Sequence, residues 1–280
     1  MVARLPGGAQ WAGMARDAKG AGMGERWAII TGAAGGIGMA VCRQLHGQGF
    51  SLLMLDVQAG PLNAAAERMR EAGARVEVMA GDATDPALAQ AAAARGAELG
   101  RVDVLVNVAG GSGPEPVRTI EAMDDATWDH VMALNLKSAF LFARAVVPGM
   151  RARGYGRVVN FSSTNARGRK GPVTTQGARL AYATSKAAIV GFTAQLAKDE
   201  AAHGITVNCL LPALILGEQG TRIRQRYEAL PEAARQAMVV DIPAGRAGEA
   251  HEVAAVVGFL CSEAASYVNG VALPVDGAFL

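Results

Sequence analysis

The chain has 280 residues, 51% of them hydrophobic, and a formal net charge of +2. This length and apolar content are enough to bury one large core as a single α/β domain. The small net charge argues against nucleic acid or an anionic membrane as the main partner, and no apolar run approaches the roughly 20 residues of a membrane span.

The cysteines and the first residues of the chain bear on its location. Cys42, Cys209 and Cys261 are scattered, odd in number and without metal-ligand spacing, so we expect reduced, buried thiols in a cytoplasmic protein and no metal. Residues 1–22 lack the hydrophobic segment of a secretory signal. We expect them to form a flexible arm, although Met23, just before the first expected strand, leaves a misassigned start open.

Short apolar or β-branched runs alternate along the chain with longer segments of helical spacing. The seven runs are Trp27–Thr31, Ser51–Asp56, Arg75–Ala80, Val102–Asn107, Arg157–Ser162, Thr206–Leu210 and Val271–Val275. Such alternation predicts right-handed βαβ units and a parallel sheet covered on both faces. We therefore predict a single doubly wound Rossmann-type α/β domain, residues 23–280, with a seven-stranded parallel sheet. Residues 213–243 are the least regular part, with a helical piece around Arg222–Leu230, and we expect a substrate lid there.

A glycine-rich turn, Thr31-Gly32-Ala33-Ala34-Gly35-Gly36-Ile37-Gly38, ends the first expected strand, and a helical pattern follows from Met39. Gly32, Gly36 and Gly38 allow a tight turn and a close approach of the backbone to a pyrophosphate, and the helix N-terminus adds free N–H groups. The alternative is a plain strand-to-helix turn. The order strand, glycines, helix favours a dinucleotide site.

Asp56 ends the second expected strand, 24 residues after Gly32. An acid at that place can accept hydrogen bonds from the adenine ribose hydroxyls and repels a 2′-phosphate. No arginine or lysine lies in the glycine turn or just after Asp56. The sequence therefore predicts NAD in preference to NADP, with a strand-end turn residue as the alternative for Asp56.

Tyr182 and Lys186 lie four residues apart in a segment of helical composition, so both side chains project from one helix face. A lysine ammonium there favours the phenolate, which brings a phenol with an intrinsic pKa of about 10 towards the working pH of an enzyme. Alone, the pair also fits a solvated helix face. A cofactor and a substrate oxygen nearby would make Tyr182 a general acid/base.

From about residue 24 to the C-terminus the chain resembles the short-chain dehydrogenase/reductase family. The glycine turn has the family's Thr-Gly-x-x-x-Gly-Ile-Gly spacing, and further matching segments follow in the family's order. They are Gly81-Asp82-Ala83, Asn107-Val108-Ala109-Gly110, Asn135 in Leu134-Asn135-Leu136, Ser162-Ser163, Tyr182 with Lys186, and Val207-Asn208 through Pro212.

The resemblance implies a role for each match. Around the cofactor, it implies contacts from Gly32, Gly36, Ile37, Gly38, Asp56, Asp82, Ala83, Asn107, Ala109, Gly110, Tyr182, Lys186, Pro212 and the Ile215 backbone. At the reacting centre, it implies Tyr182 for proton transfer and Lys186 for lowering the tyrosine pKa and holding the nicotinamide ribose. Ser163 would hydrogen-bond the substrate oxygen, and Asn135 would anchor a water of the proton relay. A strand-end cap for Ser163 and a plain helix residue for Asn135 remain alternatives.

The chain departs from the family at several positions, and one of them is Val108, which replaces the second asparagine of the Asn-Asn-Ala-Gly motif. Tyr182 comes 19 positions after Ser163, about six more than is usual, which predicts a longer loop beside the active site. Ala213 stands where the family usually has glycine, and Gly217 where a threonine often contacts the cofactor. Cofactor contacts through side chains of that segment are in doubt.

The substrate is left open by the sequence. Arginine and lysine gather in two segments expected near the site, where they suit an anionic or thioester substrate or are simply solvated charges. These residues are Arg167, Arg169, Lys170, Arg222, Arg224 and Arg226. The family resemblance implies a homotetramer built through the long helices that begin near Asp124 and Leu180 and through the C-terminal strand.

Two functions compete. The first is an NAD-dependent oxidoreductase that transfers a hydride between the cofactor and a secondary alcohol or ketone, with a 3-oxoacyl-(acyl-carrier-protein) reductase-like enzyme as a variant. The second is a catalytically idle dinucleotide-binding regulator on the same fold. Regulators of that kind typically lose the tyrosine or the lysine, and this chain keeps both.

Overall fold

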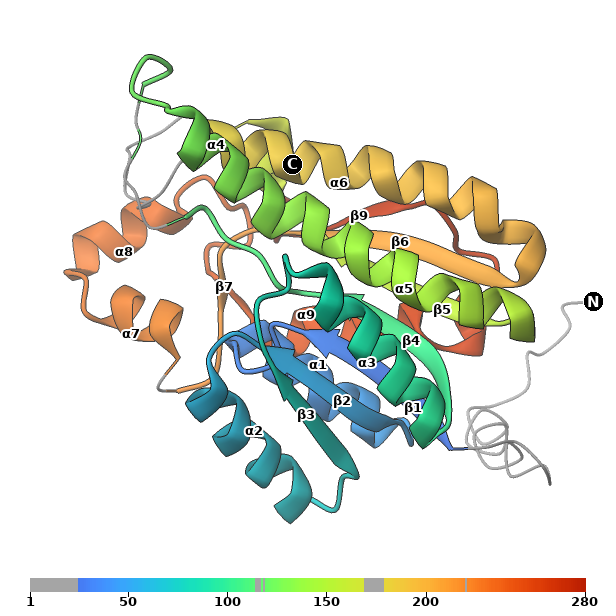
Figure 1. Cartoon of the computed structure of the whole chain (residues 1–280). Coiled ribbons are helices and arrows are strands. Elements are labelled where there is room, and N and C mark those ends of the chain that lie inside the picture. The colour runs from blue at the N-terminus through green and yellow to red at the C-terminus, as the bar shows by residue number, and fades with distance from the viewer. Residues whose placement is uncertain (1–24, 114–116, 118, 169–178, 220) are drawn as a thin grey trace, which may run out of the picture.

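The computed structural model describes residues 25–113, 117, 119–168, 179–219 and 221–280. Seven parallel strands form one sheet in the order β3-β2-β1-β4-β5-β6-β9 (Figure 1). The strands are β1 Arg26–Thr31, β2 Ser51–Asp56, β3 Val76–Ala80, β4 Arg101–Asn107, β5 Gly156–Phe161, β6 Ile205–Pro212 and β9 Ala272–Val275. The predicted doubly wound sheet is confirmed. Strand order reverses between β1 and β4, the point at which open α/β sheets bind ligands.

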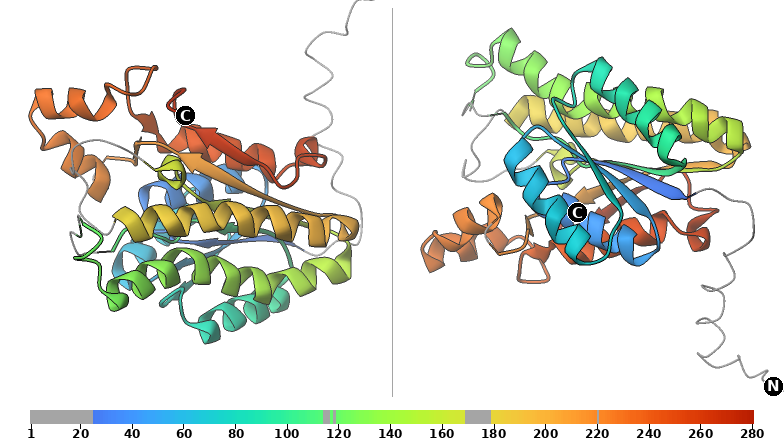
Figure 2. Two further views of the ribbon diagram at one scale, coloured as in Figure 1. Left: turned by 90° about the horizontal axis from the view of Figure 1, so that it is seen from above. Right: turned by 60° about the horizontal axis from the view of Figure 1, so that its bottom comes forward.

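Helices cover both faces of the sheet (Figure 2). Helices α3, α5 and α6 lie on one face, and α1, α2 and α9 on the other. The nine α-helices of the described residues are α1 Gly36–Gly47, α2 Ala59–Glu71, α3 Pro86–Leu99, α4 Asp125–Met132, α5 Ser138–Arg153, α6 Arg179–Glu200, α7 Arg222–Glu228, α8 Glu232–Val239 and α9 Ala250–Leu260.

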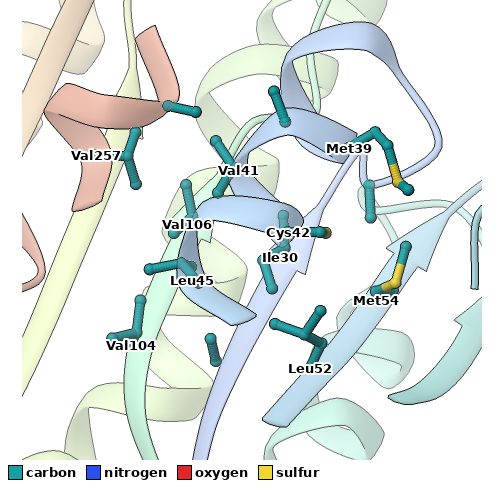
Figure 3. Packing of buried hydrophobic residues seen from close by; sticks show 14 of the residues in the cluster. Ile30, Met39, Val41, Cys42, Leu45, Leu52, Met54, Val104, Val106 and Val257 are labelled. Carbon is teal, nitrogen blue, oxygen red and sulfur yellow. The ribbon is translucent and has the colours of Figure 1, made fainter. Parts of the chain in front are cut away.

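The sheet is apolar on both faces because helices cover both. Figure 3 shows one of these layers, in which Val41 and Leu45 of α1 point onto Ile30 of β1 and Val104 of β4. These four side chains are fully buried. The layer holds α1, and with it the glycine turn, rigidly against the carboxyl ends of the central strands.

The helices α4 and α5 form one continuous run, Asp125–Arg153, through a π-helical turn at Ala133–Lys137. This run is long and apolar enough to cross a membrane by length and composition, but half of its most apolar window is buried inside the fold. A core helix of a globular domain passes the same test. The three cysteines are buried and unpaired, as the sequence predicts.

The region expected to be a lid contains more structure than the sequence predicts. It forms two helices, α7 and α8, and a short parallel pair of strands, β7 Ile215–Leu216 and β8 Gly248–Glu249. Pro231 divides the helices because it lacks the N–H that would continue α7, and it precedes the first residue of α8. The arm predicted at residues 1–22 lies outside the described residues.

A charged cluster lies at the amino ends of the strands, away from the glycine turn. Asp103 of β4 is fully buried and accepts hydrogen bonds from Arg26 at 2.8 Å and from Arg101 at 2.7 Å. Arg26 belongs to β1, so the cluster joins the first residues of two neighbouring strands. The ion pairs of Asp103 therefore join β1 to β4 at the amino ends of these strands.

Candidate active site

The glycine turn joins β1 to α1 and depends on the absence of side chains. Gly32 has a φ of +67°, which favours glycine, and a Cβ there would lie 2.9 Å from the backbone nitrogen of Ala109. A Cβ at Gly38 would collide with the carbonyl oxygen of Gly32. Because α1 begins at Gly36, the N–H groups of Gly36, Ile37 and Gly38 have no carbonyl partner within the helix. The turn therefore presents free donors and a partial positive charge at the switch point of the sheet.

Two aspartates follow the strands beside this turn. Asp56, at the end of β2, accepts hydrogen bonds from the backbone N–H of Ala34 at 3.1 Å and of Gln58 at 3.0 Å. Asp82, after β3, accepts from the N–H of Thr84 at 2.8 Å. Each carboxylate has lone pairs left for a ligand. Asp56 is thus fixed beside the glycine turn, where a ribose of a dinucleotide is expected.

Asn135 lies in the π-helical turn and clamps the segment after β4. Its amide oxygen accepts from the N–H of Gly111 at 3.0 Å, and its amide nitrogen donates to the Gly111 carbonyl at 2.8 Å and to the Val131 carbonyl at 2.8 Å. A Cβ at Gly110 would lie 2.5 Å from this amide oxygen and 3.1 Å from the Lys186 nitrogen. Gly110 is therefore the place where Asn135 and Lys186 converge. These bonds use both amide N–H groups of Asn135, and its amide oxygen keeps one lone pair that could accept from a water of the predicted relay.

Ser162 and Ser163 take different partners at the end of β5. The Ser162 hydroxyl donates to the backbone carbonyl of Lys186 at 2.7 Å, and this serine is buried. The Ser163 hydroxyl accepts from the N–H of Asn165 at 3.2 Å and shares a hydrogen bond with the phenol of Tyr182. Ser163, the residue predicted to face the substrate oxygen, is thus the one beside Tyr182.

Tyr182 is packed in an apolar cluster with Val131, Ala181, Met123 and Trp128. Burial raises the pKa of Tyr182, and the hydrogen bond with Ser163 opposes this by a smaller amount. The expected lowering of this pKa by Lys186 is not found. Sequence spacing places the lysine but says nothing of the apolar side chains that surround the phenol.

Lys186 is buried one turn further along α6. Its ammonium nitrogen donates to the Phe161 carbonyl at 2.7 Å and lies 5.6 Å from the centre of the Tyr182 ring. Burial lowers the pKa of Lys186 from 10.5 to about 7, and the Cys209 thiol opposes this weakly. The amine is thus held between the phenol and Gly110 at the heart of the site.

Polar side chains also connect the strands below the site to α6. Asn107 of β4 donates to Asn160 of β5 at 2.9 Å, and Asn160 donates to Thr193 of α6 at 3.0 Å. The N–H of Ala109 donates to the Thr31 hydroxyl at 3.2 Å, which ties the Asn107-Val108-Ala109-Gly110 segment to β1. Asn160 and Thr193 were not identified from the sequence, because a polar residue in an apolar run has no spacing signal of its own.

The segment expected to be a lid begins where β6 ends. Pro212 is the last residue of β6, and the Ile215 side chain is buried in the core, so Ile215 can meet a cofactor only through its backbone. Arg224 of α7 donates to the Gly217 carbonyl at 2.5 Å and pairs with Glu249 of β8. Arg224 therefore holds the lid together and is not available to an anionic substrate.

Of the other basic residues of the site region, the structure describes the side chains of Arg167 and Arg226. Arg167 ends the 3₁₀ turn Thr164–Arg167 and is exposed, and so is Arg226. Arg169, Lys170 and most of the longer loop predicted after Ser163 lie outside the described residues, and so does the side chain of Arg222. Within the described parts of the chain, no group of three or more His, Cys, Asp or Glu residues is placed to hold a metal ion.

A doubly wound sheet with a glycine turn at its switch point is the arrangement of Rossmann-type proteins that bind a dinucleotide. Comparison with known proteins gives the family. The family described as short chain dehydrogenase matches residues 26–228. The chain therefore belongs to the short-chain dehydrogenase/reductase family of oxidoreductases.

Relatives within the family include dehydrogenases and reductases. The chain is 37% identical over 255 residues to galactitol 2-dehydrogenase (L-tagatose-forming) of Cereibacter sphaeroides, which covers 90% of this chain and 94% of the relative. It is 33% identical over 251 residues to the 3-oxoacyl-[acyl-carrier-protein] reductase FabG of Escherichia coli K12, with coverages of 89% and 95%. The structure of YwfH, an NADPH-dependent reductase involved in bacilysin biosynthesis, superposes with a TM-score of 0.80 at 26% identity and covers 91% of this chain and 98% of YwfH.

The residues present fit a nicotinamide cofactor. The cradle at Gly32, Gly36 and Gly38 has no room for side chains, and the free N–H groups of α1 open onto it. One observation is independent of the glycines: the side-chain oxygen of Asn107, at the edge of the site, is buried without a hydrogen-bond partner among the described residues. The chemistry of the donors and the shape of the turn agree with a diphosphate-containing ligand.

Proposed function

We propose that this protein transfers a hydride between NAD(H) and a secondary alcohol or ketone, with Tyr182 as the general acid/base. The observation that carries the proposal is the convergence of Ser163, Tyr182 and Lys186 beside Gly110, at the end of the sheet where the glycine turn lies. The cofactor, when bound, supplies the hydride. The protein has to move one proton at the substrate oxygen and stabilise the charge that develops there.

The residues divide this work among them. Tyr182 gives its phenolic proton to the substrate oxygen during reduction and takes it back during oxidation. Ser163, already hydrogen-bonded to that phenol, donates to the same oxygen and favours the phenolate. Lys186 holds the nicotinamide ribose. Asn135 keeps Gly110 and Gly111 in place and takes part in the proton relay. The apolar cluster around Tyr182 excludes water from the proton transfer.

For the cofactor we propose NAD in preference to NADP. Asp56 stands at the end of β2, held by the N–H of Ala34, and its negative charge repels a 2′-phosphate. Because the chain is similar to YwfH, an NADPH-dependent reductase, NADPH is tested beside NADH. The remaining cofactor contacts are proposed as the family resemblance implies them, with Asp82 and Ala83 at the adenine and Pro212 and the Ile215 backbone at the nicotinamide.

Residues 213–243 are proposed to be the substrate lid, and the protein is proposed to be a cytoplasmic homotetramer that binds neither membrane nor nucleic acid. A reductase of acyl-carrier thioesters is the second candidate, because FabG is among the relatives. A small-molecule alcohol or ketone is favoured over an anionic one, since Arg224 is held inside the lid.

The proposal is tested by Tyr182→Phe. Loss of the phenolic proton donor should lower kcat by about 10²- to 10⁴-fold, while the Kd of NADH, measured by fluorescence titration, stays within about twofold because the cofactor's phosphates lie elsewhere. Substrates are first found by following NADH or NADPH absorbance with a panel of secondary alcohols, ketones and a 3-oxoacyl thioester.

Tyr267→Phe is the matched control, since Tyr267 is fully exposed. Unchanged turnover in Tyr182→Phe would refute the role of Tyr182. Cofactor binding by the wild-type protein without turnover of any compound of the panel would favour the idle regulator. Activity confined to the thioester would favour the second candidate.

A further inference from the structure

A groove lies between α3 and α5, on the face of the sheet that these two helices cover together with α6. The two helices pack against each other along their length (Figure 2). The groove encloses about 340 Å³, a volume within the range of small-molecule sites. Its walls consist mostly of small side chains of the two helices, Ala93, Ala94, Ala97, Ala145 and Gly149.

Gly149 keeps one wall of the groove open. It lies inside α5, where glycine is less favourable than alanine. Among the described residues, a Cβ at Gly149 would approach only the side chain of Arg153, at 3.4 Å, which is an ordinary van der Waals contact. Packing within the chain therefore does not require glycine at this position. An open groove does, because a larger side chain here would project into it.

Positive charge is in excess at the Arg153 end of the groove. Arg153, the last residue of α5, donates to the Val102 carbonyl of β4 and forms no ion pair within the described part of the chain. Asp103, whose charge acts on Arg153, already binds Arg26 and Arg101, so three guanidinium groups share one carboxylate. Burial lowers the pKa of Arg153, and Asp103 opposes this by a smaller amount. A second anion beside Arg153 would stabilise its charge.

We propose that this groove binds a free medium-chain fatty acid, with its alkyl chain between α3 and α5 and its carboxylate on Arg153. The apolar walls match the alkyl chain, and a guanidinium can hold a carboxylate through two parallel hydrogen bonds. The lining extends along α3 from Gln90 to Ala97, a length of about 10 Å. This length suits octanoate better than a long-chain fatty acid.

The fatty-acid site goes beyond the proposed function and does not depend on it. Its charged end lies at Val102, near the start of β4, and at Arg153, just before β5 begins. These are the amino ends of the strands, whereas the glycine turn lies at the carboxyl ends. The site is therefore separate from the one proposed for the cofactor.

Calorimetry and ligand-observed NMR measure the Kd values of hexanoate, octanoate, 1-octanol and octylamine for the wild-type protein. Each methylene buried in the groove should strengthen binding about fourfold, so octanoate should bind at least about tenfold more tightly than hexanoate. Octanoate should bind about two- to fivefold more tightly than 1-octanol, because Arg153 is exposed enough to be partly screened by solvent. Octylamine should bind most weakly of the three eight-carbon compounds, since its charge is repelled.

Two variants separate the charge from the groove. Arg153→Gln should reduce the affinity for octanoate to that for 1-octanol and leave 1-octanol binding unchanged. Gly149→Leu, which fills the groove, should weaken the binding of both compounds by about tenfold or more.

Gly191→Leu is the matched control, since Gly191 is an exposed glycine inside α6 and a Cβ there would meet no described atom within 4 Å. It should bind octanoate as the wild-type protein does, and thermal unfolding followed by circular dichroism checks that each variant is folded. No octanoate binding by the wild-type protein, or equal Kd values for wild type and folded Gly149→Leu, would overturn the proposal. Octylamine binding as tightly as octanoate would overturn the assignment of the carboxylate to Arg153. Self-association that Gly149→Leu abolishes would show that a second copy covers the groove, and would also overturn the proposal.

Discussion

At the scale of single residues, the chemistry of the site depends on how deeply Lys186 and Tyr182 are buried. Burial lowers the pKa of Lys186 to about 7 and raises the pKa of Tyr182. Both shifts favour the neutral forms of the two side chains in the protein without cofactor. The spacing of four residues predicts that the pair lies together, as it does, but the spacing does not give the protonation. That depends on apolar side chains such as Trp128, which come from distant parts of the chain.

The shift at Lys186 has a consequence for stability. The folded-state pKa of about 7 lies below the unfolded value of 10.5, so between these values the unfolded chain holds a proton that the folded chain does not. The free energy of unfolding should therefore rise with pH above about 7, by up to roughly 1.4 kcal/mol per pH unit from this group. Lys186→Met should remove this rise.

The measurement is urea denaturation of wild type and Lys186→Met without cofactor at pH 7, 8 and 9. Other titrating groups are shared by both proteins, so the difference between their free energies of unfolding isolates Lys186. Wild type should be least stable, relative to the variant, at pH 7 and should gain on it as the pH rises. A difference that stays constant over this range would contradict the prediction.

At the scale of elements, charged side chains join the first half of the proposed lid, residues 213–243, to the body of the protein. Glu218 pairs with Arg43 of α1, and Arg224 pairs with Glu249 of β8. The first pair bridges the contact between Gly36 and Gly217. A Cβ at Gly36 would lie 2.7 Å from the Cα of Gly217, so the two backbones are in close contact there. Under the proposed function this contact has to open before the cofactor leaves, so the ion pair should slow cofactor release.

Arg43→Gln should therefore speed NADH dissociation, measured by stopped-flow fluorescence. The two side chains are 52% and 36% exposed, and exposed pairs contribute little, so we expect an increase of about two- to fivefold. The exchanged pair Arg43→Glu with Glu218→Arg should restore the slower rate. Arg70→Gln, which breaks an exposed ion pair on α2, serves as control. Equal NADH dissociation rates in Arg43→Gln and in this control would show that the Arg43–Glu218 pair does not slow cofactor release.

Elements with strong local patterns are predicted well from the sequence, and elements without them are not. Each of the seven predicted strands lies within two residues of its observed bounds, because β-branched runs between glycine turns leave little choice. The pair β7 and β8 has only two residues in each strand and carries no periodicity. The π-helical turn at Asn135 also escaped prediction, since it arises from side-chain bonds to Gly111 that form only in the folded chain.

At the scale of the whole molecule, the residues proposed to bind the cofactor and the buried charged cluster lie at opposite ends of the sheet. The glycine turn, Asp56 and Tyr182 lie at the carboxyl ends of the strands, and the cluster of Arg26, Arg101 and Asp103 lies at the amino ends. Sequence patterns find the first group because its motifs have fixed spacing. The second group is charged residues at strand starts, which resemble ordinary surface charges until the structure shows Asp103 to be fully buried.

Asp103→Asn should be strongly destabilising and leave catalysis intact. The substitution removes the charged acceptor of two guanidinium groups that are themselves 33% and 20% exposed, so we expect a loss of about 1.5–3 kcal/mol. Glu67→Gln, at an exposed pair on α2, should cost less than about 1 kcal/mol. Urea denaturation compares the two, and turnover per folded molecule should match wild type in both. Equal stability losses would show that Asp103 is not the support of this end of the sheet.

The bonds between β5 and α6 have a mechanical consequence. Ser162 and Phe161 bond to Lys186, and Asn160 bonds to Thr193 two turns further along the same helix. Apolar contacts alone let a helix slide along a sheet in small steps, whereas a shift of one residue, about 1.5 Å, would break all of these directional bonds together. These bonds therefore fix the position of α6, which carries Tyr182 and Lys186, along β5, the strand that leads into Ser163. A slip of α6 would have to break these bonds before it could change the alignment of Ser163, Tyr182 and Lys186.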